Sequence, residues 1–213
     1  MATIAFLGTG LLGGAFAEAA AKRGDAVTAW NRSPDKALAL ARFGVKAATT
    51  PAEAVRGASR VHLVLRDDAV VDEIIAAARP GLASGAVLID HTTTLPKSTA
   101  GRAERLRSEG LDYLHCPVFM GPAAARDAKG IMMAAGPREI YERVQGDLAR
   151  MTGRLEYLGE RPDLAALNKL FGNAMIVGII AVTSDVLAMA RAGGVDPARL
   201  AQQLAEMRAN VVL

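Results

Sequence analysis

Three glycines, Gly8, Gly10 and Gly13, form a turn that constrains the fold of this chain more than any other feature of its sequence. A predicted strand at residues 3–8 precedes the turn, and an Ala-rich predicted helix at residues 11–23 follows it. In a parallel sheet, the first glycine permits a tight turn, the second lets a pyrophosphate approach the main chain, and the third lets helix and strand pack closely. Main-chain N–H groups and the positive end of the helix dipole then face the anion. The pattern predicts a dinucleotide-binding turn, and the alternative is a glycine-rich turn without a ligand.

Short apolar segments rich in β-branched residues alternate with Ala-rich segments of helical periodicity along most of the chain. Further strands are predicted at residues 26–31, 45–47, 60–65, 86–90, 112–115, 131–135 and 154–158. Helices are predicted at residues 34–42, 69–79, 96–109 and 137–150. This alternation is typical of α/β proteins, so we predict a Rossmann-type, doubly wound and mostly parallel sheet.

The alternating pattern stops near Arg161 and Pro162, where we place a domain boundary. Residues 1–161 are predicted to form a dinucleotide-binding Rossmann domain. Residues 162–213 are predicted to form an all-α domain, because strand-like segments do not recur there.

The second predicted domain begins with a long, mostly apolar helix at residues 163–192. Gly193 and Gly194 end this interdomain helix, and a further helix starts at Pro197. Alone in water, the long helix would expose a large apolar face. We therefore expect a homodimer that forms through the helical region.

Composition argues against several classes of function. The single cysteine, Cys116, allows no intrachain disulfide and no zinc site with several thiolates, and His62, His91 and His115 lack metal-ligand spacing, so we expect structural roles for all four. The formal charge of +3 comes without the long basic blocks or interleaved aromatic residues typical of nucleic-acid binding. The uninterrupted apolar run at residues 174–182 is shorter than the roughly 18 residues of a membrane span. We predict a cytoplasmic protein that binds a small-molecule substrate and no metal, nucleic acid or membrane.

Asn31, Arg32 and Ser33 follow the second predicted strand, where enzymes that bind NAD usually present an acidic residue to the ribose hydroxyls. An asparagine at this position does not repel a 2′-phosphate, and Arg32 and Ser33 can supply a charged fork and a hydroxyl group to it. We therefore predict a preference for NADP(H), with NAD(H) as the alternative cofactor.

Four segments in a fixed order give the chain a resemblance to a known family. They are the Gly8 to Gly13 turn, Asp90-His91-Thr92-Thr93 with Pro96, Cys116-Pro117-Val118-Phe119-Met120-Gly121 with Gly130, and Asn168-Lys169-Leu170 with Asn173. The chain resembles the β-hydroxyacid dehydrogenases, which include 3-hydroxyisobutyrate dehydrogenase, glyoxylate/succinic semialdehyde reductases and the cofactor domain of 6-phosphogluconate dehydrogenase. The resemblance covers nearly the whole chain. It implies hydride transfer between a nicotinamide and a small β-hydroxy acid, semialdehyde or keto acid.

The resemblance adds Leu65, Arg66, Val70 and Thr93 to the residues expected to line the cofactor cleft. The full set is Gly8, Gly10, Leu11, Leu12, Gly13, Asn31, Arg32, Ser33, Leu65, Arg66, Val70 and Thr93. Leu65 and Thr93 fall at or just past the C-terminal ends of predicted parallel strands, where ligands bind in open α/β sheets. Core packing is the alternative for Leu65 and Val70. For Thr93 and Thr92, the alternative is a turn or cap ahead of Pro96.

Lys169 matches the family's catalytic lysine, which donates a proton in carbonyl reduction and accepts one in alcohol oxidation. Asn173, one helical turn further on, is then expected to hydrogen-bond the substrate. A surface lysine that extends beside a buried helix is the alternative for Lys169. Because a free lysine has a pKa of about 10.4, reduction by the protonated ammonium is the easier direction.

Phe119, Met120 and Gly121 depart from the family pattern, which usually has Ser-Gly-Gly at these positions to hold the carboxylate of the substrate. We expect them to line, together with Thr92, a substrate site that is more apolar than usual, in which main-chain N–H groups can still donate. Core packing is the alternative for Phe119 and Met120.

Relatives continue with further helices beyond the position of Leu213, so we expect a truncated helical domain, or helices supplied by another subunit. There are two alternatives to the interpretation of the chain as a dehydrogenase. One is an imine-reductase-like NADPH enzyme with an apolar pocket, although such enzymes generally lack the lysine that matches Lys169. The other is a non-catalytic, truncated relative that only binds the dinucleotide.

Overall fold

The computed structural model describes the main chain of residues 3–210 and the side chains of residues 3–206. It divides into two units, Met1–Lys169 and Leu170–Leu213. The division falls within helix α8 (Leu164–Ala192), because the first turns of this helix bury Ala165 and Ala166 in the first unit.

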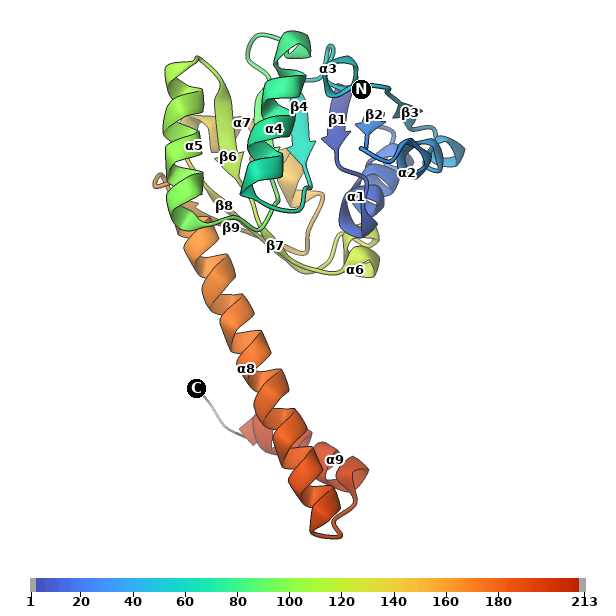
Figure 1. Ribbon diagram of the computed structural model, residues 1–213, viewed down its shortest axis with the longest axis vertical. Helices are drawn as coiled ribbons and strands as arrows, with labels where there is room; N and C mark the ends of the chain where they lie inside the picture. Colours follow the sequence, from blue (N-terminus) through green and yellow to red (C-terminus); the bar gives the residue numbers. More distant parts are fainter. Residues whose placement is uncertain (1–2, 211–213) are drawn as a thin grey trace. The chain divides into compact units, whose positions relative to one another are not determined.

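The first unit is built on a mixed sheet with the strand order β3-β2-β1-β4-β5-β6-β8-β7, in which β9 also pairs with β8 (Figure 1). The strands are β1 (Thr3–Leu7), β2 (Ala26–Trp30), β3 (Lys46–Ala47), β4 (Arg60–Leu63), β5 (Val87–Asp90), β6 (Asp112–His115), β7 (Val118–Phe119), β8 (Ile131–Ala135) and β9 (Arg154–Gly159). All neighbours from β3 to β6 are parallel, whereas β8 runs antiparallel to β6 and β7 and parallel to β9. The predicted Rossmann-type, mostly parallel sheet is therefore confirmed.

Helices cover both faces of this sheet (Figure 1). They are α1 (Leu11–Lys22), α2 (Pro34–Leu38), α3 (Pro51–Ala54), α4 (Asp68–Ala78), α5 (Pro96–Ser108), α6 (Pro122–Arg126) and α7 (Arg138–Ala149). Side chains alternate along β1, so Ile4 and Phe6 join a core cluster with α1 and α7, and Ala5 and Leu7 join a second cluster with α4 and α5. Burial on both faces keeps the strand ends, which carry the site, in a fixed place.

Three short elements, α3, α6 and β7, were not predicted from the sequence, because one helical turn or two strand residues show no periodicity. The first turn of α3 is fixed by a local cap, in which the Thr50 hydroxyl accepts from the Glu53 N–H at 3.1 Å and the Glu53 carboxylate accepts from the Thr49 N–H at 2.8 Å. The helix predicted at residues 34–42 is shorter than expected. It ends at Leu38 and continues as a 3₁₀ turn at Ala41–Phe43.

The second unit holds the remainder of α8 and helix α9 (Pro197–Asn210). Gly194 has a φ of +73° between them, and Asp196 Oδ1 accepts a hydrogen bond of 3.0 Å from the Ala198 N–H at the start of α9. Large apolar side chains are exposed along α8: Phe171, Met175, Ile176, Val177, Ile179, Ile180, Val182 and Met189.

By length and composition, α8 could cross a membrane, since an 18-residue window within it has a mean hydropathy of 1.8. The apolar run at residues 174–182 is too short for this, but the whole helix of 29 residues is not. A single such helix, identified by length and composition only, does not establish a membrane span. The expectation that the chain binds no membrane stays a prediction.

Candidate dinucleotide-binding site

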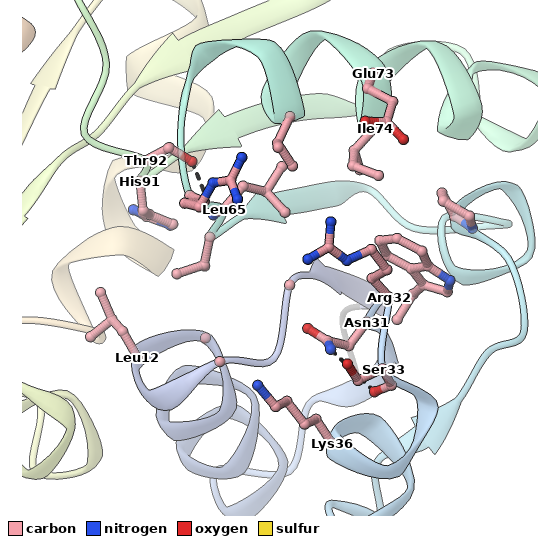
Figure 2. Close-up of a pocket in the computed structure, with 18 of the residues that line it drawn as sticks. Leu12, Asn31, Arg32, Ser33, Lys36, Leu65, Glu73, Ile74, His91 and Thr92 are labelled. Carbon is pink, nitrogen blue, oxygen red and sulfur yellow. Dashed lines mark hydrogen bonds between the residues drawn. The ribbon is translucent and has the colours of Figure 1, made fainter.

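A cavity of about 620 Å³ opens beyond the C-terminal ends of β1, β2, β4 and β5 in the first unit (Figure 2). Every residue predicted to bind the cofactor lines this cavity, and so does Thr92. Its remaining lining residues were not predicted: Trp30, Lys36, Pro51, Val64, Glu73, Ile74, Ala77 and His91. The sheet therefore brings together segments that are up to about 85 residues apart in the chain, at the edge where open α/β sheets bind ligands.

Close packing requires glycine at two positions of the glycine turn, Gly8 and Gly13. The third position, Gly10, has free space around it. A Cβ atom on Gly8, whose φ is +97°, would lie 2.3 Å from the Val64 oxygen, and one on Gly13 would lie 2.0 Å from the Gly8 oxygen. A Cβ on Gly10 would meet no atom within 4 Å. Gly10 is also the N-cap of α1 and offers no side chain to the free N–H groups of the first turn. The turn thus leaves main-chain donors and the helix dipole to receive an anion.

Asn31 joins the glycine turn to the loop after β2. Its Oδ1 accepts a hydrogen bond of 2.9 Å from the Thr9 N–H, and its Nδ2 donates to the Ser33 oxygen at 3.1 Å. The sequence indicated only that an amide at this position does not repel a phosphate. The geometry adds that the same amide positions both loops.

Arg32, Ser33 and Lys36 are exposed and line the same part of the cavity (Figure 2). Ser33 is the N-cap of α2 and Lys36 lies in its first turn, so the two residues are neighbours at the start of this short helix. Two cations and a hydroxyl group therefore gather at the end of β2. Lys36 was not predicted from the sequence, although its spacing of three residues from Ser33 carried a signal.

Thr92 and Thr93 lie at the opposite part of the cavity, after β5. Thr92 is buried, its hydroxyl oxygen accepts from the Leu65 N–H at 3.1 Å, and its own N–H donates to Asp90 Oδ1 at 2.9 Å. These bonds hold the loops after β4 and β5 together. Thr93 is exposed and lines the cavity, so its side chain is accessible to a ligand.

His91, the cavity residue between Asp90 and Thr92, belongs to a buried histidine pair. His62 Nδ1 lies 3.0 Å from His91 Nε2, and His91 Nδ1 lies 2.7 Å from the Cys116 oxygen. A carbonyl oxygen only accepts, so His91 carries its proton on Nδ1 and accepts from His62 at Nε2. Burial lowers the pKa of His91 to about 4 and the pKa of His62 well below its usual value. Both rings are therefore neutral near pH 7.

Arg102 ties the helices beside the cavity to the end of β5. It is buried, donates to Asp68 Oδ1 and Asp72 Oδ1 of α4 at 2.9 Å each, and lies 3.8 Å from Asp90. The Tyr113 hydroxyl donates to Asp90 Oδ2 at 2.9 Å. This network fixes the strand end from which the loop with Thr92 departs.

Lys169 lies outside the lining of the cavity, against β7. Its Nζ donates to the Val118 oxygen at 2.8 Å and lies 3.9 Å from the centroid of the Phe119 ring. Burial lowers the pKa of Lys169. Phe119, Met120 and Gly121, the N-cap of α6, also lie outside the cavity lining, and Asn173 belongs to the second unit.

The family model for the NAD-binding domain of 6-phosphogluconate dehydrogenase matches residues 3–159. This match spans almost the whole first unit, including the glycine turn and the cavity. The chain belongs to the β-hydroxyacid dehydrogenase family. The resemblance seen in the sequence is thereby confirmed, and the matched domain is a dinucleotide-binding domain of NAD(P)-dependent oxidoreductases.

Several members of the β-hydroxyacid dehydrogenase family and its neighbours are similar over most of this chain. It is 26% identical over 211 residues to glyoxylate/succinic semialdehyde reductase 2 of Arabidopsis thaliana, covering 98% of this chain and 59% of that protein. It is 28% identical to 3-hydroxyisobutyrate dehydrogenase of Pseudomonas aeruginosa, covering 95% of this chain and 68% of that protein. The solved imine reductase of Streptomyces aurantiacus superposes with a TM-score of 0.91 at 29% identity, over 97% of this chain and 73% of that one. The chain thus spans about two thirds of the length of these relatives.

Proposed function

We propose that this β-hydroxyacid dehydrogenase family member binds NADP(H) in the cavity and uses it in hydride transfer to or from a small carbonyl compound. The observation that carries the proposal is the cavity itself, which is lined by the glycine turn, the cationic loop after β2 and the threonine loop after β5. A nicotinamide cofactor supplies the hydride. The chain's own residues bind the pyrophosphate, orient the two ends of the cofactor and handle the proton.

A preference for NADP(H) over NAD(H) is supported by the charges after β2. Arg32 and Lys36 are both exposed cations on the cavity lining, and Ser33 adds a hydroxyl group. The amide of Asn31 stands where a carboxylate would repel a 2′-phosphate. NADP(H) and NAD(H) differ only in the 2′-phosphate, so the preference depends on this corner.

Lys169 is our candidate for the group that donates the proton in reduction and accepts it in oxidation. Its ammonium is half-buried and hydrogen-bonded to a main-chain oxygen, so its position is fixed, and burial lowers its pKa. A protonated amine with a lowered pKa is a stronger acid than a free lysine, which favours reduction. Asn173 remains a candidate to hydrogen-bond the substrate.

The substrate class that we favour is a small β-hydroxy acid, semialdehyde or keto acid, held near Thr92 and the segment Phe119 to Gly121. A second candidate is imine reduction with NADPH. It is supported by the apolar side chains of Phe119 and Met120 and by the similarity to the Streptomyces imine reductase. The lysine at position 169 argues for the first candidate.

A substrate panel followed by NADPH absorbance tests these proposals. Turnover of succinic semialdehyde or a keto acid, abolished in Lys169→Met, supports the main proposal. Turnover of cyclic imines without turnover of carbonyl acids would replace it with the second. Tight NADP⁺ binding with no turnover of either class would leave only a dinucleotide-binding role.

We also propose a cytoplasmic homodimer that forms through the helical region. The support is the row of exposed apolar side chains on α8, which includes Phe171, Met175 and Ile180. Light scattering on the purified chain measures the mass. A monomer at micromolar concentration would contradict the proposal.

A further inference from the structure

Lys169 is held by two adjoining residues of a very short strand. The main-chain oxygen of Val118 accepts a proton from its Nζ at 2.8 Å, and the ring of the next residue, Phe119, lies 3.9 Å from the same nitrogen. The nitrogen is therefore over the ring within the distance at which an aromatic face attracts a cation. Of the three N–H groups of the ammonium, one is used by Val118, so a donor remains for a ligand.

The strand that carries these two groups is rigidly fixed. Val118 pairs with Met132 and Phe119 pairs with Ile131 of β8. A Cβ on Gly130, whose φ is +89°, would lie 2.8 Å from the Phe119 oxygen, so β7 packs tightly on the turn before β8. The Phe119 side chain also packs on the apolar cluster formed by Met133, Ala135 and Ala165, which reaches the first turn of α8. The ring and the helix start that bears Lys169 thus share one packed cluster.

No carboxylate among the described residues forms an ion pair with Lys169. Asp163, which directly precedes α8, is paired with Arg161 at 2.8 Å, and Glu156 of β9 is paired with Arg154. No charged side chain on β7, β8, β9 or α8 contributes to the lowered pKa of Lys169, and burial is its cause. The negative face of the Phe119 ring and the Val118 oxygen are therefore the groups that favour the charged amine.

We propose that Phe119 is a positioning residue. Its ring keeps the Lys169 ammonium protonated and holds it beside β7 in position for proton transfer. The proposal rests on the role proposed above for Lys169. It assigns Phe119 a function that differs from lining a substrate pocket. An aliphatic side chain of similar volume would preserve the apolar packing and lose the attraction to the cation.

Nuclear magnetic resonance of the full chain tests the contact without any turnover. The chain has six lysines, so ¹³C-labelled lysine gives a tractable spectrum. We expect the Lys169 ε-methylene protons to be shifted upfield by the ring. In Phe119→Leu this shift disappears, and the Lys169 titration midpoint falls by about one pH unit, the size of an ordinary cation–ring interaction. Phe119→Tyr keeps both features.

A matched control comes from the contact between the exposed Lys22 and the partly buried Phe43 ring, 4.9 Å from nitrogen to centroid. Phe43→Leu removes the same chemical group and should change the Lys22 resonance alone. If Phe119→Leu leaves the Lys169 shift and midpoint unchanged, or if Phe43→Leu changes them equally, the proposal is wrong.

The rate of NADPH-dependent reduction gives the second readout. An acid that must be protonated loses activity as pH rises through its pKa, so a lower pKa in Phe119→Leu moves the alkaline limb of kcat/KM down by about one pH unit. Phe119→Tyr restores the limb. If Lys169→Met leaves the wild-type rate and profile unchanged, the proposed function fails, while the resonance experiment still decides the role of Phe119.

Discussion

The side-chain oxygen of Asn31 accepts a hydrogen bond of 2.9 Å from the main-chain N–H of Thr9, in the middle of the glycine turn. Because the amide nitrogen of Asn31 also donates to the Ser33 oxygen at 3.1 Å, one side chain joins the turn after β1 to the loop after β2. In the proposed complex with NADP(H), the first of these segments would face the pyrophosphate and the second the 2′-phosphate. Cofactor affinity and cofactor preference are therefore linked through Asn31.

Asn31→Asp should reduce NADPH affinity and largely spare NADH. An aspartate still accepts from Thr9, but it loses the bond to the Ser33 oxygen and places a negative charge beside the 2′-phosphate site. We expect the Kd for NADPH to rise about tenfold or more, because a like charge added beside the proposed 2′-phosphate site costs roughly 1.4 kcal/mol or more. Fluorescence titration with both cofactors measures this. Asn31→Ala is the control, since it breaks both bonds and should weaken both cofactors; equal losses in Asn31→Asp would contradict the charge argument.

Arg32→Ala should weaken NADPH binding roughly 10- to 100-fold, the range of a hydrogen bond to a charged group, and leave NADH almost unchanged. Lys36→Ala should cost less, because an exposed ammonium acts as a point charge that salt screens. Titrations at low and high salt separate the two. Arg56→Ala, an exposed arginine outside the cavity lining, should change neither cofactor. Loss of NADH affinity in Arg32→Ala would remove the assignment of this corner to the 2′-phosphate.

The glycines of the turn should separate folding from binding. Gly13→Ala places a Cβ 2.0 Å from the Gly8 oxygen and should lower the free energy of unfolding by about 2–4 kcal/mol in urea denaturation. A Cβ on Gly10 meets no atom within 4 Å, so Gly10→Ala should leave stability almost unchanged while it weakens dinucleotide binding. Gly146→Ala in α7 is the matched control, with open space at its Cβ and an expected gain of about 0.5–1 kcal/mol. A destabilised Gly10→Ala would show that the turn is not open to a ligand.

The sheet could be predicted from the sequence because its signals are local. Each of the longer strands coincides with a short run of apolar residues, and the glycine turn is recognised by the spacing of its glycines. The strand β7 could not be predicted in this way, since Val118 and Phe119 alone show no period. Its pairing with β8 is set by tertiary packing against Gly130.

The chemistry of the site was predicted unevenly for the same reason. The cofactor-binding residues predicted after β1, β2, β4 and β5 could be inferred from their positions near strand ends. All of these predicted residues line the cavity. Contacts between side chains that are far apart in the sequence leave no local sequence pattern from which they could be predicted. The contact of Lys169 with Phe119, and the hydrogen bond of His62 to His91, required coordinates.

The buried histidines should make the protein sensitive to mild acid. The pKa of His91 is lowered to about 4, and those of His62 and His115 are also lowered by burial. Above about pH 7.5 each ring is almost entirely neutral in both the folded and the unfolded chain, so these groups do not change stability there. Between about pH 6.5 and 4 the histidines of the unfolded chain bind protons, whereas the buried histidines of the folded chain stay neutral. The free energy of unfolding therefore falls as pH falls. Each such histidine contributes at most about 1.4 kcal/mol per pH unit.

His62→Leu removes one of these groups from the core beside Phe6, whose ring stacks on it at 4.7 Å between centroids. The variant should lose some stability at pH 7, because His91 Nε2 then lacks its donor. Its free energy of unfolding should nevertheless fall less steeply than that of the wild type between pH 6.5 and 4.5, by up to about 1.4 kcal/mol per pH unit. Urea denaturation at pH steps of half a unit measures both slopes. Carboxylates with lowered pKa, such as Glu18 and Asp72, add the same acid loss to both proteins and cancel in the difference. Parallel slopes would mean that His62 takes up a proton in the folded core, against the burial that surrounds it.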